Sequence, residues 1–349
     1  MAAATASSVK ILVCGDLYGS LDKAFKRAAK INKAHGPFEA LLCVGTTLSN
    51  PETGASDLQN YIDGKKKAPL PTYFIAGNEH KSVSGSLDKL PTGGEIAPNL
   101  HYLGRSGIKE VSGLSIGYLS GIHSEMYYRN RTPPSVREAA YQAHFEEGDV
   151  EHLVKEAAQG GVDILLTCEW GRGYYKLYNP TQLPSVKSQP PTKAGSPVVS
   201  ELAIATAPRY HFAATEHCFH KLRPYRNADV AHVTRFIGMG NVGNPDKKQK
   251  YIYALNAKPL AKMTTEEKGS MPEDSTLCPY DYQPVKRPSA PSTEEAPLKK
   301  IKLERVDLTS LDKQRFSGDY GGAAQAWRWQ PQNRGGGRGR RGGGRGGRG

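Results

Sequence analysis

Apolar residues in the first part of the chain form short continuous runs, and each run ends in a small or polar residue. Such runs occupy residues 9–14, 38–44 and 73–76. Runs of this length are typical of strands that are buried on both faces of a parallel sheet. Between the first two runs, the apolar residues of segment 21–28 recur at helical spacing. This pattern predicts a helix that crosses over the sheet.

The pattern becomes richer in strands further along the chain. Residues 99–121 contain short apolar stretches separated by glycines, which predicts an antiparallel meander. Strand–helix alternation followed by strand-rich sequence predicts a layered α/β domain over residues 9–262, with mixed β-sheets flanked by helices. The remaining predicted elements are helices at 56–67, 149–159 and 198–206 and strands at 162–167, 208–214, 232–238 and 250–256.

Three further segments are expected to lie outside this domain. Residues 1–8 should form a flexible N-terminus, and residues 263–333, rich in Lys, Glu, Ser and Pro, a disordered linker. Residues 334–349 read RGGGRGRRGGGRGGRG and cannot form a core. Within the linker, Lys286-Arg287 and the segment KKIK at 299–302 suggest a nuclear localisation signal.

Charge and cysteine content narrow the functional classes. The net charge is +13, which favours an anionic partner, and the arginines at the end of the chain strengthen that bias. Five cysteines without a CxxC pair argue against a disulfide framework or a zinc finger and fit a reducing compartment. We expect no signal peptide, because the first residues lack a long apolar stretch, and no membrane span, because no apolar run approaches 18 residues.

Polar clusters follow several predicted strands, and these clusters carry the candidate chemistry. In open α/β sheets, ligands bind at the carboxyl ends of the strands. Each cluster alone is compatible with an ordinary loop, but their repeated position predicts a site along this edge. They are GDLYG at 15–19, GTT at 45–47, GNEH at 77–80, TCEW at 167–170 and TEH at 215–217.

Residues 9–262 resemble the N-terminal domain of CwfJ-type splicing factors. That family is related to the RNA lariat debranching enzyme and the calcineurin-like metallophosphoesterases. The resemblance implies a metallophosphoesterase-like domain in a nuclear protein that associates with the spliceosome. It is carried by ILVCGDLYGSLD (11–22), LLCVG (41–45), TYFIAGNEH (72–80), NLHYLGRSGI (99–108), GVDILLT (161–167), PRYHFAATEH (208–217), PYRN (224–227) and HVTRFIGMGNVGNPDKKQKYIYAL (232–255).

Compared with that family's motifs, this chain has lost most of the residues that bind metal. Active metallophosphoesterases clamp phosphate between two ions about 4 Å apart, and such ions repel strongly unless an anion bridges them. Thr46 stands where the bridging Asp should be, so we expect no dinuclear centre, no cofactor and no catalysis. The sequence leaves open whether a single ion binds at Asp16, Asn78, Cys168 and His217. Asp16, Asn78 and His217 match ligand positions, whereas Tyr18, Thr46, Cys168 and Thr215 replace ligands.

Basic and aromatic residues suggest an RNA-binding role for this chain. They interleave between residues 209 and 226, a composition that suits an RNA backbone, although a solvated basic surface is the alternative. Arginines on a glycine-rich tail contact phosphates and stack on bases with little sequence preference. The predicted RNA-binding residues are Arg209, His211, His217, Lys221, Arg223, Arg226, Trp327, Trp329, Arg334, Arg338, Arg340, Arg341, Arg345 and Arg348.

The sequence thus favours a non-catalytic RNA-processing factor in splicing or intron lariat turnover, located in the nucleus. The implied partners are RNA, spliceosomal proteins and the RNA lariat debranching enzyme. One alternative is an active metal-dependent phosphodiesterase acting on RNA, which would need His80 or Cys168 as a ligand; another is a scaffold that binds only protein. CwfJ-type proteins usually continue into HIT-like domains with a His-rich motif, and none follows residue 262. We therefore expect a short form, or one in which the tail replaces those domains.

Overall fold

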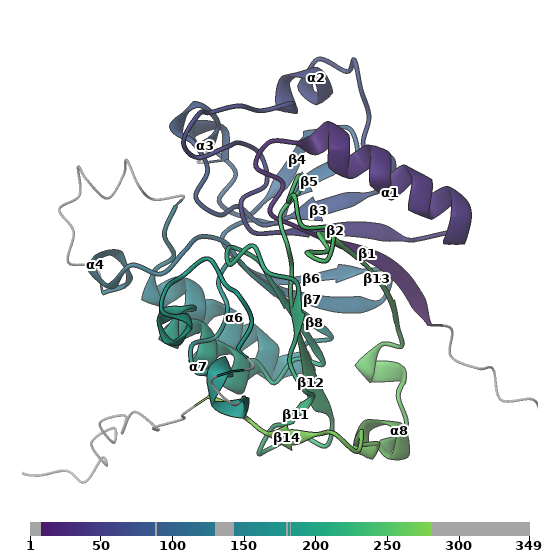
Figure 1. Ribbon diagram of the computed structural model, residues 1–349. Coiled ribbons are helices and arrows are strands. Elements are labelled where there is room, and N and C mark those ends of the chain that lie inside the picture. The colour runs from purple at the N-terminus through teal and green to yellow at the C-terminus, as the bar shows by residue number, and fades with distance from the viewer. Residues whose placement is uncertain (1–7, 88, 130–142, 179–180, 182, 281–349) are drawn as a thin grey trace, which may run out of the picture. The chain divides into compact units, whose positions relative to one another are not determined.

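A computed structural model describes residues 8–87, 89–129, 143–178, 181 and 183–280. Within these residues, two β-sheets lie face to face and helices cover their outer faces (Figure 1). No helix in these ranges is long and apolar enough to cross a membrane.

The first sheet has six strands in the order β13-β1-β2-β3-β5-β4. Strands β1, β2, β3 and β5 are parallel, and the two edge strands β13 and β4 run antiparallel to their neighbours. The bounds are β1 Val9–Gly15, β2 Ala40–Val44, β3 Thr72–Phe74, β4 Gly94–Ala97, β5 Leu100–Tyr102 and β13 Ile252–Ala257.

The second sheet follows the order β14-β11-β12-β9-β8-β7-β6, with β10 also paired to β12. Strands β7, β8, β9 and β12 are parallel and form its centre. The bounds are β6 Ser106–Val111, β7 Leu114–Leu119, β8 Ile164–Thr167, β9 Tyr210–Ala213, β10 His220–Lys221, β11 Tyr225–Arg226, β12 Val233–Gly238 and β14 Thr276–Leu277.

Helices pack on the outer face of each sheet. The first sheet is covered by α1, and the second by α6 and α7, as the cores that they share with the strands show. The helices are α1 Leu21–His35, α2 Leu58–Ile62, α3 Lys81–Leu87, α4 Glu125–Tyr128, α6 Glu147–Gly160, α7 Pro197–Thr206 and α8 Thr265–Gly269, with 3-10 turns at Tyr174–Leu177, Pro191–Lys193 and Leu260–Lys262.

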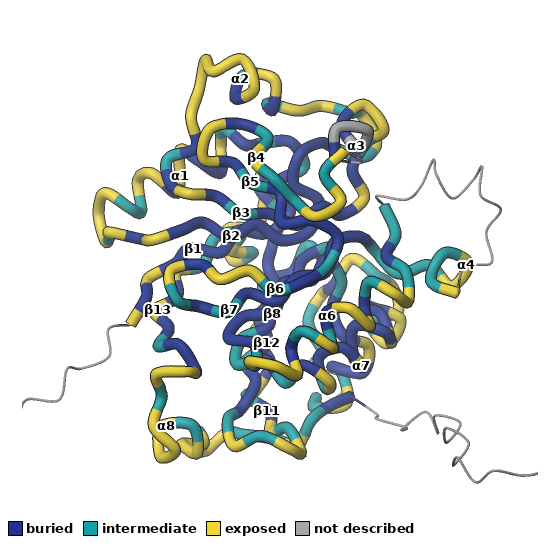
Figure 2. Tube along the Cα trace, turned by 180° about the vertical axis from the view of Figure 1, so that it is seen from behind, coloured by how far each residue is buried: buried dark blue, intermediate teal, exposed yellow. Residues whose placement is uncertain are grey.

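The alternation of side chains along β1 explains why its apolar run is continuous. Ile11 and Val13 face the other sheet and join the core between the sheets. Leu12 and Cys14 face the opposite way and pack under α1. Both faces of the strand are therefore buried, which produces the dark central band in Figure 2.

The layered α/β prediction is confirmed, but the predicted meander over residues 99–121 is wrong. β5 belongs to the first sheet, and only β6 and β7 form an antiparallel hairpin, in the second sheet. The chain passes between the sheets after β5 through Gly104, where φ is +109° and an added Cβ would lie 2.9 Å from the Gly93 nitrogen. A local glycine pattern does not show that successive strands join different sheets.

Residues 263–280 are also ordered, although the sequence assigned them to a linker. α8 begins with a capping box between Thr264 and Glu267, and β14 pairs with β11. Tyr280 is buried, and its ring lies where a side chain at Gly171 would stand. These contacts are made with distant segments, which is why local composition did not reveal them.

Candidate functional site at the carboxyl ends of the strands

The carboxyl ends of the two sheets meet around Asp16, which follows β1. The Thr46 amide, after β2, donates to Asp16 Oδ1 at 2.9 Å. The Thr215 amide, after β9 in the other sheet, donates to Oδ2 at 2.7 Å. A side chain at Gly45 would lie 2.1 Å from Oδ1, so glycine is required there. Both carboxylate oxygens are thus held by backbone groups of the protein.

Burial makes Asp16 an unusual carboxyl group. It is fully buried, and burial is the main cause that raises its pKa to about 7. The amide hydrogen bonds from Thr46 and Thr215 and the nearby charge of Lys187 oppose this shift, whereas Glu79 adds to it. Asp16 therefore titrates near neutral pH.

Tyr18 and His217 form a second pair beside Asp16. The Tyr18 hydroxyl lies 2.7 Å from His217 Nε2, and their rings meet edge to face with centroids 5.5 Å apart. Burial is the main cause that lowers the pKa of His217 and raises that of Tyr18, so both are neutral at physiological pH. Tyr18, which the sequence predicts to replace a ligand, thus engages His217 of the TEH motif.

Backbone strain is concentrated at the same place. Tyr18, Thr215 and His217 have φ values of +47°, +64° and +53°. Non-glycine residues in this left-handed region cost on the order of 1–3 kcal/mol each, and they often gather at functional sites. Here the strained turns aim the Thr215 amide at Asp16 and the imidazole at Tyr18.

Glu79, which follows Asn78 in the GNEH motif, organises the loop after β2. Its buried carboxylate accepts hydrogen bonds from the amides of Thr47, Leu48 and Ser49 at 2.6, 3.1 and 2.8 Å. The Ser49 hydroxyl adds a fourth bond at 2.9 Å. Burial raises the pKa of Glu79, and these donors counteract that shift. Glu79 thus fixes the loop that presents the Thr46 amide.

The other residues at ligand positions have different surroundings. The Cys168 thiol is buried and donates to the Ala76 carbonyl at 3.4 Å, and burial raises its pKa well above the ordinary value. Asn78 is exposed. His80 Nδ1 lies 2.9 Å from the Ser82 hydroxyl. Cys168 is thus a neutral thiol. The His80 ring contacts Ser82 in the first turn of α3, the helix that begins directly after His80.

These residues do not fit the dinuclear metal centre of active metallophosphoesterases. The Thr46 side chain carries no charge, both Asp16 oxygens accept backbone amides, and His217 is bonded to Tyr18. Within the described part of the chain, no group of three or more His, Cys, Asp or Glu side chains is placed to hold a metal ion. The donor set supplies no anion that could hold two cations together.

The structure separates the residues that the sequence grouped as RNA-binding. Lys221, Arg223 and Arg226 are exposed. Arg209 lies at the opposite end of β9 from His217, where its guanidinium donates to the Lys258 carbonyl at 2.6 Å. Trp327, Trp329, the tail arginines and both basic clusters of the linker lie outside the described residues.

The burial of His211 contradicts its predicted role as an RNA-binding residue. This residue is fully buried, its Nε2 lies 2.8 Å from the Thr167 hydroxyl, and burial lowers its pKa to about 3. It is therefore a neutral core residue that RNA does not reach. The alternation along β9 places His211 on the face opposite Tyr210 and Phe212, where its ring lies 5.0 Å from that of Phe236 in the core under the helices.

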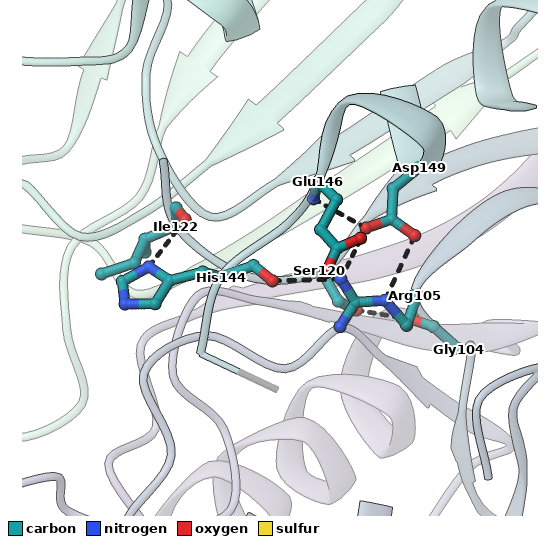
Figure 3. A network of polar contacts seen from close by, with 7 residues as sticks. All are labelled: Gly104, Arg105, Ser120, Ile122, His144, Glu146 and Asp149. Atoms are coloured by element: carbon teal, nitrogen blue, oxygen red, sulfur yellow. Dashed lines mark hydrogen bonds and ion pairs between the residues drawn. The ribbon is translucent and has the colours of Figure 1, made fainter. Parts of the chain in front are cut away.

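A second polar network holds the start of α6 against the turn between the sheets (Figure 3). Arg105 is buried and donates to Asp149 through Nε at 3.1 Å and through a terminal nitrogen at 2.5 Å, and to the His144 carbonyl at 3.0 Å. Ser120 joins the same turn by donating to the Gly104 carbonyl at 2.6 Å. No sequence motif pointed to Arg105, since its partners come from distant segments.

The sequence also missed three residues that define the surroundings of the site. Glu216 is buried and accepts hydrogen bonds from the Ser188 amide and hydroxyl, both at 2.9 Å. This contact fixes the loop that carries Lys187, whose charge acts on Asp16 and His217. The position of Glu216 inside the TEH motif was the only signal available for it.

The fold and the site define a layered α/β domain with two mixed sheets, in which a buried carboxyl group at the carboxyl ends of the strands is held by backbone amides from both sheets. Sequence comparison then gives the family. CWF19-like protein 1 of Xenopus laevis is 35% identical over 93% of this chain and 58% of the relative. CWF19-like protein 1 of Homo sapiens is 38% identical over 78% of this chain and 48% of the relative. This chain is therefore a CWF19-like homologue over most of its own length, and the predicted family resemblance is confirmed.

Other comparisons add detail. A rice relative, zinc finger CCCH domain-containing protein 59 of Oryza sativa subsp. japonica, is 35% identical over 92% of this chain and 52% of that protein. The chain spans about half the length of these curated relatives. Among solved structures, TT1561 of Thermus thermophilus matches 72% of the chain with a TM-score of 0.41 and 13% identity, too distant to support a functional argument. No protein-family model matches the chain.

Proposed function

We propose that this chain is a non-catalytic RNA-processing factor that acts in pre-mRNA splicing or intron lariat turnover. Its partners in the nucleus are RNA, spliceosomal proteins and the RNA lariat debranching enzyme, whose activity it supports. The homology to CWF19-like proteins supports the splicing assignment. The arginine-glycine tail and the positive charge support RNA as a partner.

The non-catalytic part of the proposal depends on one observation, the capping of Asp16 by two backbone amides. The Thr46 and Thr215 amides take one lone pair on each Asp16 oxygen, and burial raises the pKa of Asp16 to about 7, so this carboxyl group has fewer lone pairs and less charge to offer a cation than a free carboxylate. The missing bridging carboxylate at position 46 adds to this, because paired cations need an anion between them. The edge of the sheets is thus suited to hold a ligand or partner rather than to hydrolyse one.

Two measurements on the purified full-length chain test this proposal. The first is elemental analysis together with hydrolysis of a 2′,5′-linked RNA in the presence of Mn²⁺ or Zn²⁺. We expect no stoichiometric metal and no turnover above that of a denatured sample. Turnover that is abolished by Asp16→Asn but retained by Asp57→Asn would establish the active phosphodiesterase instead.

The second measurement is affinity purification of the chain from nuclei. We expect spliceosomal proteins and intron lariats to be recovered together, and lariat recovery to fall after nuclease treatment. Recovery of proteins alone, unchanged by nuclease and without any lariat, would identify a protein-only scaffold and contradict the proposal.

A further inference from the structure

A row of aromatic rings with cations above them lies between β13 and the second sheet. Tyr253 of β13 lies beside Phe212 of β9, with centroids 5.8 Å apart, and beside Phe219, at 6.3 Å. The Lys221 ammonium is 4.8 Å from the Tyr253 ring centroid. The Lys250 ammonium is 5.3 Å from that of Phe219. We refer to Phe219, Lys221, Lys250 and Tyr253 as the seam surface.

The seam surface is accessible and its charge is uncompensated. Both lysines are exposed, and both rings are only partly buried. Within the described ranges, neither lysine ammonium forms a salt bridge or a hydrogen bond. Their contacts are with the ring faces alone, so an anion can approach them without displacing a carboxylate.

A neighbouring cavity extends this positive surface. It has a volume of about 460 Å³, and its lining includes Arg27, Lys247, Lys250 and Tyr251. Its one acidic residue, Asp246, is engaged by the Lys248 amide and the Gln249 side chain. Lys250 lines the cavity and also belongs to the seam surface, so it connects the two.

The region is held rigidly next to the strand-end site. The Phe219 amide donates to the Gln249 side chain at 2.7 Å, which fixes the ring relative to the segment that carries Lys250. The Asn244 side chain donates to the His217 carbonyl at 3.4 Å. Phe219 follows His217 by two residues, so a ligand on the seam surface would bind next to the strand-end site.

Similar chemistry recurs further along the same side of the molecule. The guanidinium carbons of Arg209 and Arg235 lie 5.3 and 5.9 Å from the Tyr210 ring centroid. Tyr210 precedes Phe212 by two residues on β9, so both side chains are on the same face of that strand. Ring and cation pairs thus occur near both ends of β13, Lys221 with Tyr253 at one end and Arg209 with Tyr210 beside Lys258 at the other.

We propose that the seam surface binds single-stranded RNA, with bases stacking on Phe219 and Tyr253 and phosphates contacting Lys221 and Lys250. This inference deepens the proposed RNA-processing function and rests on it. Partly exposed rings accept any base, and lysines beside them neutralise the backbone, which is the chemistry of sequence-tolerant single-strand sites. Double-stranded RNA keeps its bases stacked inside and cannot use the rings.

Binding of a short fluorescent oligouridylate, measured by anisotropy over a series of salt concentrations, tests the proposal. The variants are Phe219→Leu with Tyr253→Leu, and Lys221→Gln with Lys250→Gln, each in the full chain and in a chain lacking residues 334–349. The matched controls are Tyr73→Leu, a partly buried ring on β3, and Lys23→Gln with Lys89→Gln, two exposed lysines elsewhere. Circular dichroism confirms that each variant folds.

In the tail-deleted chain, the aromatic variant should bind at least about tenfold more weakly, because one stacked base contributes on the order of a factor of ten. The lysine variant should flatten the log–log salt slope by roughly 1.4, at about 0.7 for each lost phosphate contact. Ultraviolet crosslinks of RNA to the unaltered chain should map to segments 219–221 and 249–253. This test does not depend on whether the variants fold.

Seam variants that bind like the controls, or crosslinks that map elsewhere, would overturn the seam assignment while leaving the nuclear purification result intact. Equal affinity for duplex RNA would likewise contradict base stacking. Failure of the full chain to bind any RNA, together with recovery of proteins alone from nuclei, would instead remove the proposed function itself.

Discussion

The Tyr18 hydroxyl and His217 Nε2 lie 2.7 Å apart although 199 positions separate the two residues in the chain. Tyr18 follows β1 of the first sheet and His217 follows β9 of the second, so this bond joins the two sheets at their carboxyl ends. The sequence predicts that both residues stand at former metal-ligand positions, and in this structure the two side chains bind each other.

Replacement of Tyr18 by phenylalanine should therefore destabilise the protein. The change keeps the ring but leaves His217 Nε2 without its partner, which costs about 1 kcal/mol for a partly buried group. Urea unfolding measures the loss. Tyr73→Phe is the control, because within the described residues the Tyr73 hydroxyl has no hydrogen-bond partner. Equal losses for the two variants would show that the Tyr18–His217 bond adds no stability.

Asp16 should make stability depend on pH in a predictable direction. Its pKa is about 7 in the folded protein and about 3.8 as its ordinary value. Between these values the folded state retains a proton that the unfolded state has released. The stability that this group contributes is therefore fully present below about pH 4. It falls by about 1.4 kcal/mol for each pH unit between about 4 and 7, and it is lost once the pH has passed the folded pKa.

The comparison with Asp16→Asn isolates this contribution. Wild type should lose stability relative to the variant from pH 4 to pH 7, and the difference should then stay constant. Chemical unfolding at several pH values provides the test. A difference that is flat across this range would mean that Asp16 titrates at its ordinary pKa.

Arg105→Ala should be far more damaging than the loss of a surface arginine. Removal of Arg105 leaves Asp149 partly buried without its cation, which typically costs about 3–5 kcal/mol. Arg129 forms an exposed pair with Glu125 at 3.0 Å, so Arg129→Ala should cost less than about 1 kcal/mol. Thermal and urea unfolding of both variants check this, and similar costs for the two would contradict the role given to the network in Figure 3.

Deletion of residues 334–349 should weaken RNA binding and reduce its salt dependence. Six arginines are lost, and each phosphate contact to a single strand contributes about 0.7 to the log–log slope. Anisotropy with a labelled single strand at several salt concentrations measures both quantities. Replacement of the six arginines by lysine is the matched comparison, since it keeps the charge and removes guanidinium stacking. An unchanged slope after deletion would remove the tail from RNA binding.

Local sequence was sufficient for the layered α/β class and for most of the parallel strands, but not for the assignment of β5 and β6 to different sheets. Continuous apolar runs predicted the parallel strands, because burial on both faces leaves no polar positions. The motifs after those strands predict that Thr46 and Cys168 replace ligands. Family resemblance rested on segments whose order the relatives share.

Tertiary structure decided what the remaining residues do. The bonds of Asp16 to Thr215 and of Tyr18 to His217, and the meeting of Lys221 with Tyr253, all join segments far apart in the chain. The burial of His211 and the ordering of residues 263–280 depend likewise on distant strands. The physical reason is that hydrophobic periodicity is a local property, whereas the partner of a side chain is set by sheet pairing and by the crossing of the chain from one sheet to the other.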